Sequence, residues 1–457
     1  MNLAQWFAFL GAIIGISKIV ADFGLNRKSQ IIAALFFATL PMAILQASST
    51  QNDLVETLWI ICLAERFLAW RKEPKLHYSI DFGIALGLAI CTKGTAYPIA
   101  FAFVVAYAIM SIRQYRTKLI GALCAATICL MLNVPHYIRN YVTFKNPIET
   151  SDKTMASPSV ESFFISLFSN IYVNIPIPVP KSNEINEELF KVDKNIYPYG
   201  SIYVYSKDKW LKERGGMPFF HEDFMKNTFH TIFIIIAFIS VFYIKKKRCV
   251  LYSLIVLACW GMFVLCIPWQ PWITRLQTPL FALSAPLFAF MFNRIRYTKL
   301  KTFCLLMLCG FSLLPLFFNR TRPLLSFQAI PIVEEWTLNK MFWNTSRDEL
   351  VFYNYPGTYQ DYTSACYIIS KTNTADIGLI IGADTWEYPL WRYMRHTKSV
   401  TPQINHEVSD SIYLKANTLF ILNRSNNIVD INDKNKDIPF VYQRDVSQWV
   451  ILYPYNK

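Results

Sequence analysis

Apolar residues fill long runs of this chain, and short polar loops separate one run from the next. Several runs approach the roughly 20 apolar residues that a helix needs to cross a bilayer. The pattern predicts ten such helices, of which the fourth is short for a full crossing. Their residues are 2–20, 31–48, 54–69, 79–91, 95–112, 119–134, 228–243, 251–267, 277–292 and 303–318. We therefore expect an all-α polytopic membrane protein with about nine or ten spanning helices.

Basic residues collect in every second loop between these runs. The basic loops contain residues 18–28, 71–75, 113–118, 245–248 and 294–301. Since loops rich in Lys and Arg stay on the cytoplasmic side, this alternation sets the orientation. The short loops on the other side hold only Lys93 and Arg275 as cations. Met1 is then expected on the outer face, as are residues 135–227 and 319–457.

The two long polar stretches differ in their patterns. Within 135–227, residues 160–171 have the apolar spacing of an interfacial amphipathic helix. The tail contains short apolar runs that are typical of buried strands, namely 377–381, 418–422 and 449–453. We expect one transmembrane domain over 1–318, which carries the outer loop, and a C-terminal extracytoplasmic α/β domain over 319–457.

Composition excludes several classes of protein. The chain of 457 residues is 53% hydrophobic with a mean hydropathy of +0.27, which is too apolar for a soluble protein. Its net charge of +14 lies in short loops and not on one soluble surface, so nucleic acid is not an expected partner. Nine of the ten cysteines lie in or beside apolar runs, which predicts neither a disulfide framework nor a zinc site. The first run ends in Lys18 without a small-residue cleavage site, so we expect no cleavable signal peptide.

One lysine stands between two apolar runs. Lys93 lies beside Gly94, where the runs 79–91 and 95–112 meet. A charge near the end of a membrane helix is unfavourable unless it faces water, a partner or a ligand. The compact ammonium group of lysine is well suited to hold a phosphate. We therefore interpret the rest of the chain as a scaffold that places other polar groups on the same side of the membrane as Lys93.

Four motifs lie on the predicted outer side. They are QASSTQND (46–53), GLAICTKG (87–94), NVPHYIRN (133–140) followed by Asn146 and Pro147, and WITRLQTP (272–279). Together they resemble glycosyltransferases of the GT-C fold, and above all bacterial relatives of the protein O-mannosyltransferases and the lipid A aminoarabinose transferase, as in glycosyltransferase family 39. The resemblance extends over about residues 4–292.

The resemblance implies an enzyme of the inner (cytoplasmic) membrane. Its donor would be a polyprenyl-phosphate sugar, transferred on the outer face, usually with inversion, to an envelope lipid, glycan or protein. In the family, an acidic residue in the first outer loop acts as the base. The first apolar run of this chain resembles the family's second helix, so the family's first helix and acidic loop have no counterpart here. The base is then expected either to precede Met1 or to be supplied by Asp53, Glu222 or Asp223.

Cations are expected to bind the phosphate of such a donor. Cleavage of the sugar–phosphate bond leaves a polyprenyl phosphate, and cations that meet its developing charge lower the barrier. The candidate cations are Lys93, Arg139 and Arg275. For each, the alternative is a residue at the membrane surface that meets lipid headgroups or caps helix carbonyls. The candidate substrate-binding residues on the same side are Asn52, Asn140 and His136.

The acidic candidates have structural alternatives. Asp53 begins the third apolar run, where a carboxylate can cap the helix by accepting main-chain N–H groups. His221, Glu222 and Asp223 come just before the run 228–243. Mixed nitrogen and oxygen ligands can bind a divalent cation, so His221 and Glu222 are a candidate metal pair. A solvated acidic helix start explains the same residues, and no cofactor is required by the sequence.

Two other functions stay open. One is a truncated, catalytically incomplete GT-C homologue that binds the lipid donor without a base. The other is a transporter or flippase of lipid-linked sugars. A transporter more often shows paired half-repeats and charges in the middle of its helices. Here most charges lie at the ends of the apolar runs, which favours an active site at the membrane surface.

Overall fold

A computed structural model describes most of the helical part of the chain and separate stretches of the tail. The described residues are 2–113, 117–148, 160–175, 220–241, 243, 247–267, 272–319, 321–325, 341–352, 356–370, 376–380, 388–390, 392, 403–406, 419–423, 440–446 and 449–454. Contacts between residues divide the chain into two compact units, Met1–Met341 and Phe342–Lys457. The first unit is helical, and the second contains a sheet.

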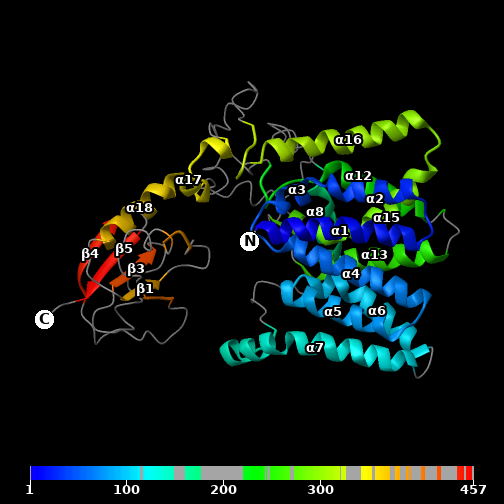
Figure 1. The fold of residues 1–457 in the computed structure, drawn as a ribbon, viewed down its shortest axis with the longest axis horizontal. Coiled ribbons are helices and arrows are strands. Elements are labelled where there is room, and N and C mark those ends of the chain that lie inside the picture. Colours follow the sequence, from blue (N-terminus) through cyan, green and yellow to red (C-terminus); the bar gives the residue numbers. More distant parts are fainter. Residues whose placement is uncertain are drawn as a thin grey trace. The chain divides into compact units, whose positions relative to one another are not determined.

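Helices build the first unit, and every apolar run of the sequence coincides with one of them or with a pair (Figure 1). The run 31–48 holds a pair because Pro41 has no N–H group to continue the first helix. The helices are α1 (Asn2–Asp22), α2 (Arg27–Ala38), α3 (Pro41–Ala47), α4 (Asp53–Lys72), α5 (Leu76–Thr92), α6 (Ala96–Arg113), α7 (Thr117–Phe144), α8 (Val160–Tyr172), α12 (Thr228–Val241), α13 (Lys247–Cys266), α14 (Ile273–Leu276), α15 (Thr278–Arg294) and α16 (Thr298–Phe317).

Four of the described helices are long and apolar enough to span a membrane: α1, α7, α13 and α16. The pair α2 and α3, bent by 70° at its break, makes a fifth candidate if the two are one span. The helices α5, α6 and α12 are apolar but shorter. The chain is therefore an all-α, multi-pass membrane protein in this unit, and the count of ten crossings stays a prediction.

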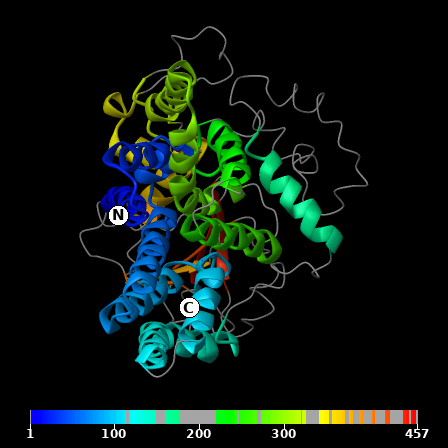
Figure 2. The ribbon, with the colours of Figure 1, turned by 90° about the vertical axis from the view of Figure 1, so that its right-hand side faces the viewer.

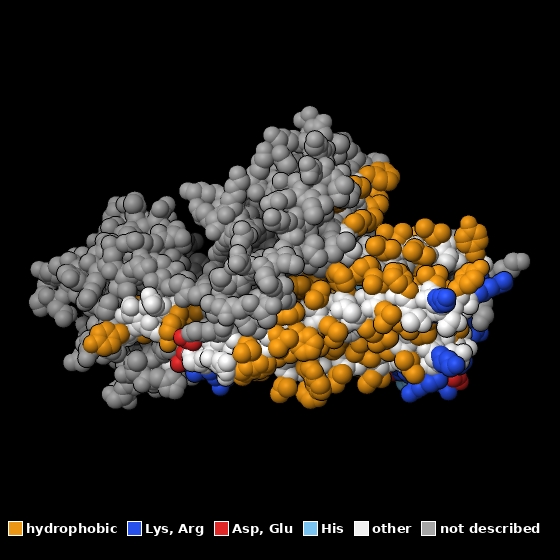
Figure 3. Space-filling view, turned by 90° about the horizontal axis from the view of Figure 1, so that it is seen from above, with side chains coloured by type: hydrophobic (Ala, Val, Ile, Leu, Met, Phe, Trp, Pro, Cys, Tyr) orange, Lys and Arg blue, Asp and Glu red, His pale blue; other side chains and the backbone are white. Residues whose placement is uncertain are grey.

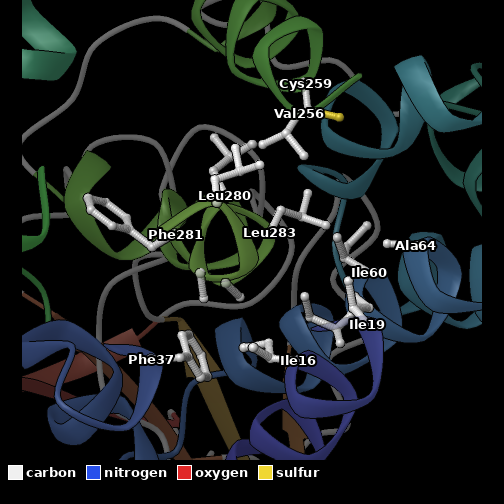
Figure 4. Close-up of a cluster of buried hydrophobic side chains, with 14 of the residues drawn as sticks. Ile16, Ile19, Phe37, Ile60, Ala64, Val256, Cys259, Leu280, Phe281 and Leu283 are labelled. Carbon is white, nitrogen blue, oxygen red and sulfur yellow. The ribbon is translucent and has the colours of Figure 1, made fainter. Parts of the chain in front are cut away.

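The helices of this unit lie side by side, with α7 at one edge and α16 at the other (Figure 1), as Figure 2 also shows. Between these edges, α1, α4 and α15 contact one another. Residues 278–292 of α15 are all buried, which is typical of a helix in the middle of a core. Figure 4 shows this core between α1, α2, α4, α13 and α15, where the labelled side chains are Ile16, Ile19, Phe37, Ile60, Ala64, Val256, Cys259, Leu280, Phe281 and Leu283.

Apolar side chains cover the described surface of the helices as a broad belt, and Lys and Arg side chains gather at one end of it (Figure 3). Large apolar residues on α7 and α16, such as Leu123 and Leu306, are exposed in this unit. A belt of this kind matches the hydrocarbon of a bilayer. The basic end includes Arg27, which opens α2, and Arg294, which closes α15. We call the opposite end of the helices, where α4 begins and α5 ends, the Lys93 end.

Two glycines let α5 approach α7 closely. A Cβ atom on Gly83 would lie 2.5 Å from the main-chain oxygen of Ala125, and one on Gly87 would lie 3.2 Å from the Cα atom of Cys129. Small residues four apart are a common means of packing membrane helices, because they bring the two main chains together.

Gly83→Ala is therefore expected to destabilise the protein by about 1–3 kcal/mol, since α7 must move to admit the methyl group. The measurement is the thermal unfolding midpoint of the purified protein in detergent. Gly261→Ala is the matched control, because a Cβ atom there meets no atom within 4 Å. Equal midpoints for the two variants would contradict the close packing of α5 on α7.

The second unit combines short helices with a five-stranded sheet of order β2-β1-β3-β5-β4. The strand β1 runs parallel to β2 and β3, whereas β5 runs antiparallel to β3 and β4. Three strands, β1, β3 and β5, lie at the apolar runs of the tail. Whether this unit is an extracytoplasmic domain stays a prediction. The elements are a 3₁₀ turn (Phe342–Asn344), α17 (Arg347–Val351), α18 (Pro356–Ser370), β1 (Asp376–Ile380), β2 (Gln403–His406), β3 (Leu419–Asn423), β4 (Phe440–Val446) and β5 (Trp449–Pro454).

Candidate functional site

Lys93 lies in the turn between α5 and α6 and pairs with the first residue of α4. Its Nζ donates a hydrogen bond to Asp53 Oδ1 at 2.5 Å. The Asp53 side chain is fully buried, and that of Lys93 is 17% exposed. Removing one partner of a buried pair leaves the other charge uncompensated, which is strongly destabilising. The buried position of each charge therefore requires the presence of the other.

The N-terminus of α4 is capped by a side chain from another helix. The main-chain N–H groups of Leu54 and Val55 donate to Gln5 Oε1, at 3.0 and 3.1 Å. Gln5 belongs to α1 and is buried. The N-cap residue itself, Asn52, makes no capping bond with its side chain. Gln5 thus takes the capping role that the sequence offered as an alternative for Asp53, and the Asp53 carboxylate is left to Lys93.

Side chains from the first turn of α4 also hold the turn on both sides of Lys93. Asn52 Nδ2 donates to the main-chain oxygen of Thr92 at 2.8 Å. Thr95 Oγ1 donates to Glu56 Oε1 at 2.7 Å. Glu56 is not among the residues that the sequence pattern singled out. The signal that could have found it is its position: Glu56 is an acidic residue inside an apolar run. It lies three positions after Asp53, and residues at this spacing share one face of a helix.

The two carboxylates in the first turn of α4 each have one oxygen without a hydrogen-bond partner among the described residues. Asp53 Oδ2 and Glu56 Oε2 are buried, and neither has a hydrogen-bond partner among the described residues. Both side chains are 0% exposed. Buried polar atoms in native structures nearly always have a partner, so an unmatched atom points to water, an ion or a functional role.

Arg275 forms a second ion pair at this end of the unit. It lies in α14, and its Nη1 donates to Asp223 Oδ1. The two side chains are 19% and 27% exposed, so this pair is more open than that of Lys93. The main-chain N–H of Asp223 donates to His221 Nδ1 at 3.1 Å. The structure therefore brings two predicted residues of the outer loop, His221 and Asp223, to the predicted cation Arg275.

Glu222 faces a different set of partners. Its Oε2 accepts from Thr321 Oγ1 at 2.7 Å, and Arg322 Nη2 lies 3.2 and 3.3 Å from its two oxygens. Arg322 also donates to the main-chain oxygen of Ser48. Glu222 thus ties the segment before α12 to the residues after α16 and to the loop before α4. These contacts favour a structural role, and its catalytic role stays an untested prediction.

Two buried glutamines connect the two ion pairs. Gln5, which caps α4, donates from Nε2 to Gln46 Oε1 at 3.5 Å. Gln46, in α3, donates from Nε2 to the main-chain oxygen of Glu222 at 2.6 Å. The next residue along the chain is Asp223. A continuous path of hydrogen bonds and main chain therefore runs from the Asp53–Lys93 pair to the Asp223–Arg275 pair.

The remaining candidates form a separate group on α7. Arg139 Nη2 and Asn140 Nδ2 each lie 3.1 Å from a ring nitrogen of His136. No contact within the described part of the chain joins these three residues directly to Lys93 or Arg275. An indirect link exists, since the hydroxyl groups of Tyr97 and Tyr137 lie 2.6 Å apart, between the start of α6 and the residue after His136.

The candidate metal pair has protein partners. Glu222 is bonded to Arg322, and His221 Nδ1 accepts from a main-chain N–H. Among the described residues, no group of three or more His, Cys, Asp or Glu side chains is placed to hold a metal ion. A metal held by His221 and Glu222 would have to displace these bonds, and the site stays a prediction.

Lys226 lies just before α12, and its side chain is largely removed from water. Burial lowers the pKa of its ammonium group to about 8, and among the described residues no carboxylate pairs with it. The proton is therefore held more weakly in the folded chain than in the unfolded chain. Stability rises with pH between about 8 and the usual lysine pKa near 10.4, and the penalty is fully present below pH 8.

Lys226→Met is expected to stabilise the protein at pH 7 by about 1–3 kcal/mol, because it removes a desolvated charge and keeps an apolar stem. The gain should shrink toward pH 10.5, where the native lysine has lost its proton. The measurement is the thermal unfolding midpoint against pH. Lys75→Met, at an exposed lysine of the basic end, is the control. A gain that is the same at both pH values would contradict the explanation by burial.

A comparison with protein families finds a match for the N-terminal part of the chain, which contains Asp53 and Lys93. Residues 1–138 match the family described as dolichyl-phosphate-mannose-protein mannosyltransferase. No curated protein matches the chain. Among solved structures, the crystal structure of ArnT from Cupriavidus metallidurans bound to undecaprenyl phosphate is similar, with 12% sequence identity and a TM-score of 0.49 over 99% of this chain and 83% of that one. The family resemblance seen in the sequence motifs is thus confirmed for residues 1–138, which contain Asp53 and Lys93.

Proposed function

We propose that this chain is a membrane glycosyltransferase that moves a sugar from a polyprenyl phosphate to an envelope lipid, glycan or protein. The observation that carries the proposal is the arrangement at the Lys93 end. Two cations, Lys93 and Arg275, each stand beside a carboxylate, and one path of hydrogen bonds and main chain connects the two pairs. The mannosyltransferase-family match of residues 1–138 supports the reaction class.

The two ion pairs suit the two halves of such a reaction. The bond between the anomeric carbon and the phosphate oxygen breaks, and the electron pair leaves with the polyprenyl phosphate. Preorganised cations stabilise that charge where it develops, which is the task we assign to Lys93 and Arg275. The acceptor oxygen forms the new bond to the anomeric carbon, and its proton must pass to a base.

Exposure separates the candidate bases. Asp223 is 27% exposed, whereas Asp53 is fully buried against Lys93. A general base must come within hydrogen-bond reach of the proton that it removes. We therefore assign the base to Asp223 and give Asp53 the task of holding Lys93 in place. Glu222, bonded to Arg322, supports the loop that carries Asp223.

The proposal includes a topology. We place the Lys93 end, residues 135–227 and the C-terminal α/β unit on the non-cytoplasmic side of the inner membrane, with ten crossings in all. The support is the gathering of Lys and Arg at the opposite end of the helices (Figure 3), which is the side that membrane proteins keep in the cytoplasm.

A single assay tests the function. The full-length protein is reconstituted in lipid vesicles with a polyprenyl-phosphate sugar that is radiolabelled in the sugar, together with envelope lipids and proteins as acceptors. Transfer of label to an acceptor is the expected result. Movement of label across the vesicle membrane without transfer would instead identify a flippase. Binding of the donor with neither transfer nor movement would identify a catalytically incomplete homologue.

A further inference from the structure

Gln46 is a buried amide whose two ends are bonded to different parts of the chain. Its Nε2 donates to the main-chain oxygen of Glu222, and its Oε1 accepts from Ser49 Oγ at 3.0 Å and from Gln5 at 3.5 Å. The side chain is 0% exposed. Moving it would leave buried polar groups without partners, which is energetically expensive. Gln46 therefore fixes the main chain at Glu222 relative to α1 and α4.

Each direction from Gln46 leads to a charged pair of the candidate site. On one side, Gln5 caps α4, and the first turn of α4 holds the turn that carries Lys93. On the other side, the main chain continues from Glu222 into Asp223, the partner of Arg275. The helix α3 that carries Gln46 is itself held, because the main-chain N–H of Met42 donates to Asn227 Oδ1 at 3.1 Å.

We infer that Gln46 is a positioning residue that sets the separation of Lys93 and Arg275 around the phosphate of the donor. The inference rests on the proposed function. Two cations that meet one phosphate group must stand at a fixed separation, and a displacement of about 1 Å can lower a rate about a hundredfold. Gln46 touches no substrate in this role and acts only through the two pairs that it connects.

The test uses undecaprenyl phosphate as the probe and the full-length protein in lipid nanodiscs. Gln46→Met keeps the size of the side chain and removes its hydrogen bonds. Tyr252→Phe is the control for lost stability, because it removes one buried hydrogen bond, from Tyr252 Oη to the main-chain oxygen of Leu283, between α13 and α15. We expect Gln46→Met to lower the affinity for the probe by about tenfold or more and Tyr252→Phe to leave the affinity unchanged.

A double variant separates positioning from general destabilisation. In an Arg275→Gln background only one cation is left to position, so adding Gln46→Met should change the affinity by less than about twofold. An equal loss of affinity in the native and the Arg275→Gln backgrounds would overturn the inference. It would also be overturned if Lys93→Met weakened binding of the probe while Gln46→Met left it unchanged. If the native protein does not bind the probe, or binds it equally well without Lys93, the proposed function itself is wrong and the inference falls with it.

Discussion

Lys93→Met is expected to weaken the binding of undecaprenyl phosphate by at least about thirtyfold and to abolish sugar transfer. Lys93 is one of the two cations that we place around the donor phosphate, and it is held in position by α4. Removing a charge that meets an anion inside a partly buried site affects the complex far more than removing a charge from an open surface. Binding to the protein in nanodiscs measures the first effect, and transfer of labelled sugar measures the second.

The same substitution also has a structural effect that must be kept apart from binding. It leaves the fully buried Asp53 carboxylate without its partner, which is expected to lower stability by about 3–5 kcal/mol. Lys93→Met/Asp53→Asn removes both charges, so we expect it to regain most of the lost stability and none of the binding. Lys75→Met, at the basic end, should change neither.

The double variant decides between the two roles of Lys93. Recovery of undecaprenyl phosphate binding together with stability would show that Lys93 acts only as the structural partner of Asp53. Binding that stays lost in a well-folded double variant supports a phosphate contact. The thermal unfolding midpoint of each variant, measured in the same detergent, shows whether its stability has been regained, so that its binding can be interpreted.

The helices could be predicted from the sequence because an apolar run of this length has few alternatives in a bilayer. Each of the ten predicted runs is helical, one of them as a broken pair, and the described residues contain at least four candidate spans. The break in the run 31–48 was missed, although Pro41 lies within it. A proline inside an apolar run is compatible both with a kink in one helix and with the start of a second helix. The packing of α3 against α14 and α16 shows that Pro41 starts a second helix.

The partners of the charged residues could not be predicted, because they depend on how distant helices pack. Lys93 meets Asp53 across 40 positions, and Arg322 meets Glu222 across 100. The sequence marked Lys93 and Arg275 as unusual cations but did not show that a carboxylate stands beside each. Gln5 and Gln46 lie inside apolar runs, where a polar side chain requires a partner. The positions of these two glutamines in the sequence therefore indicated that each has a buried partner, but not which residues those partners are.

Neutralising the adjacent carboxylates Glu222 and Asp223 is expected to give opposite results. Glu222→Gln weakens the ion pair with Arg322, which holds the segment before α12 to the residues after α16. We expect a loss of about 1–3 kcal/mol in stability, seen as a lower unfolding midpoint. Asp223 is 27% exposed, and its partners among the described residues, Arg275 and His221, belong to the candidate site, so Asp223→Asn should change the midpoint little.

Asp223→Asn should instead separate donor binding from catalysis. In the site that we propose, the Asp223 carboxylate competes with the donor phosphate for Arg275, so its neutralisation is expected to raise the affinity for undecaprenyl phosphate by about threefold to fivefold. Transfer should nevertheless fall by about a hundredfold or more, because the acceptor proton has lost its base. Tighter binding with normal transfer would move the base to Asp53 or Glu222. Weaker binding would mean that Asp223 orients Arg275 for the phosphate and does not compete with it.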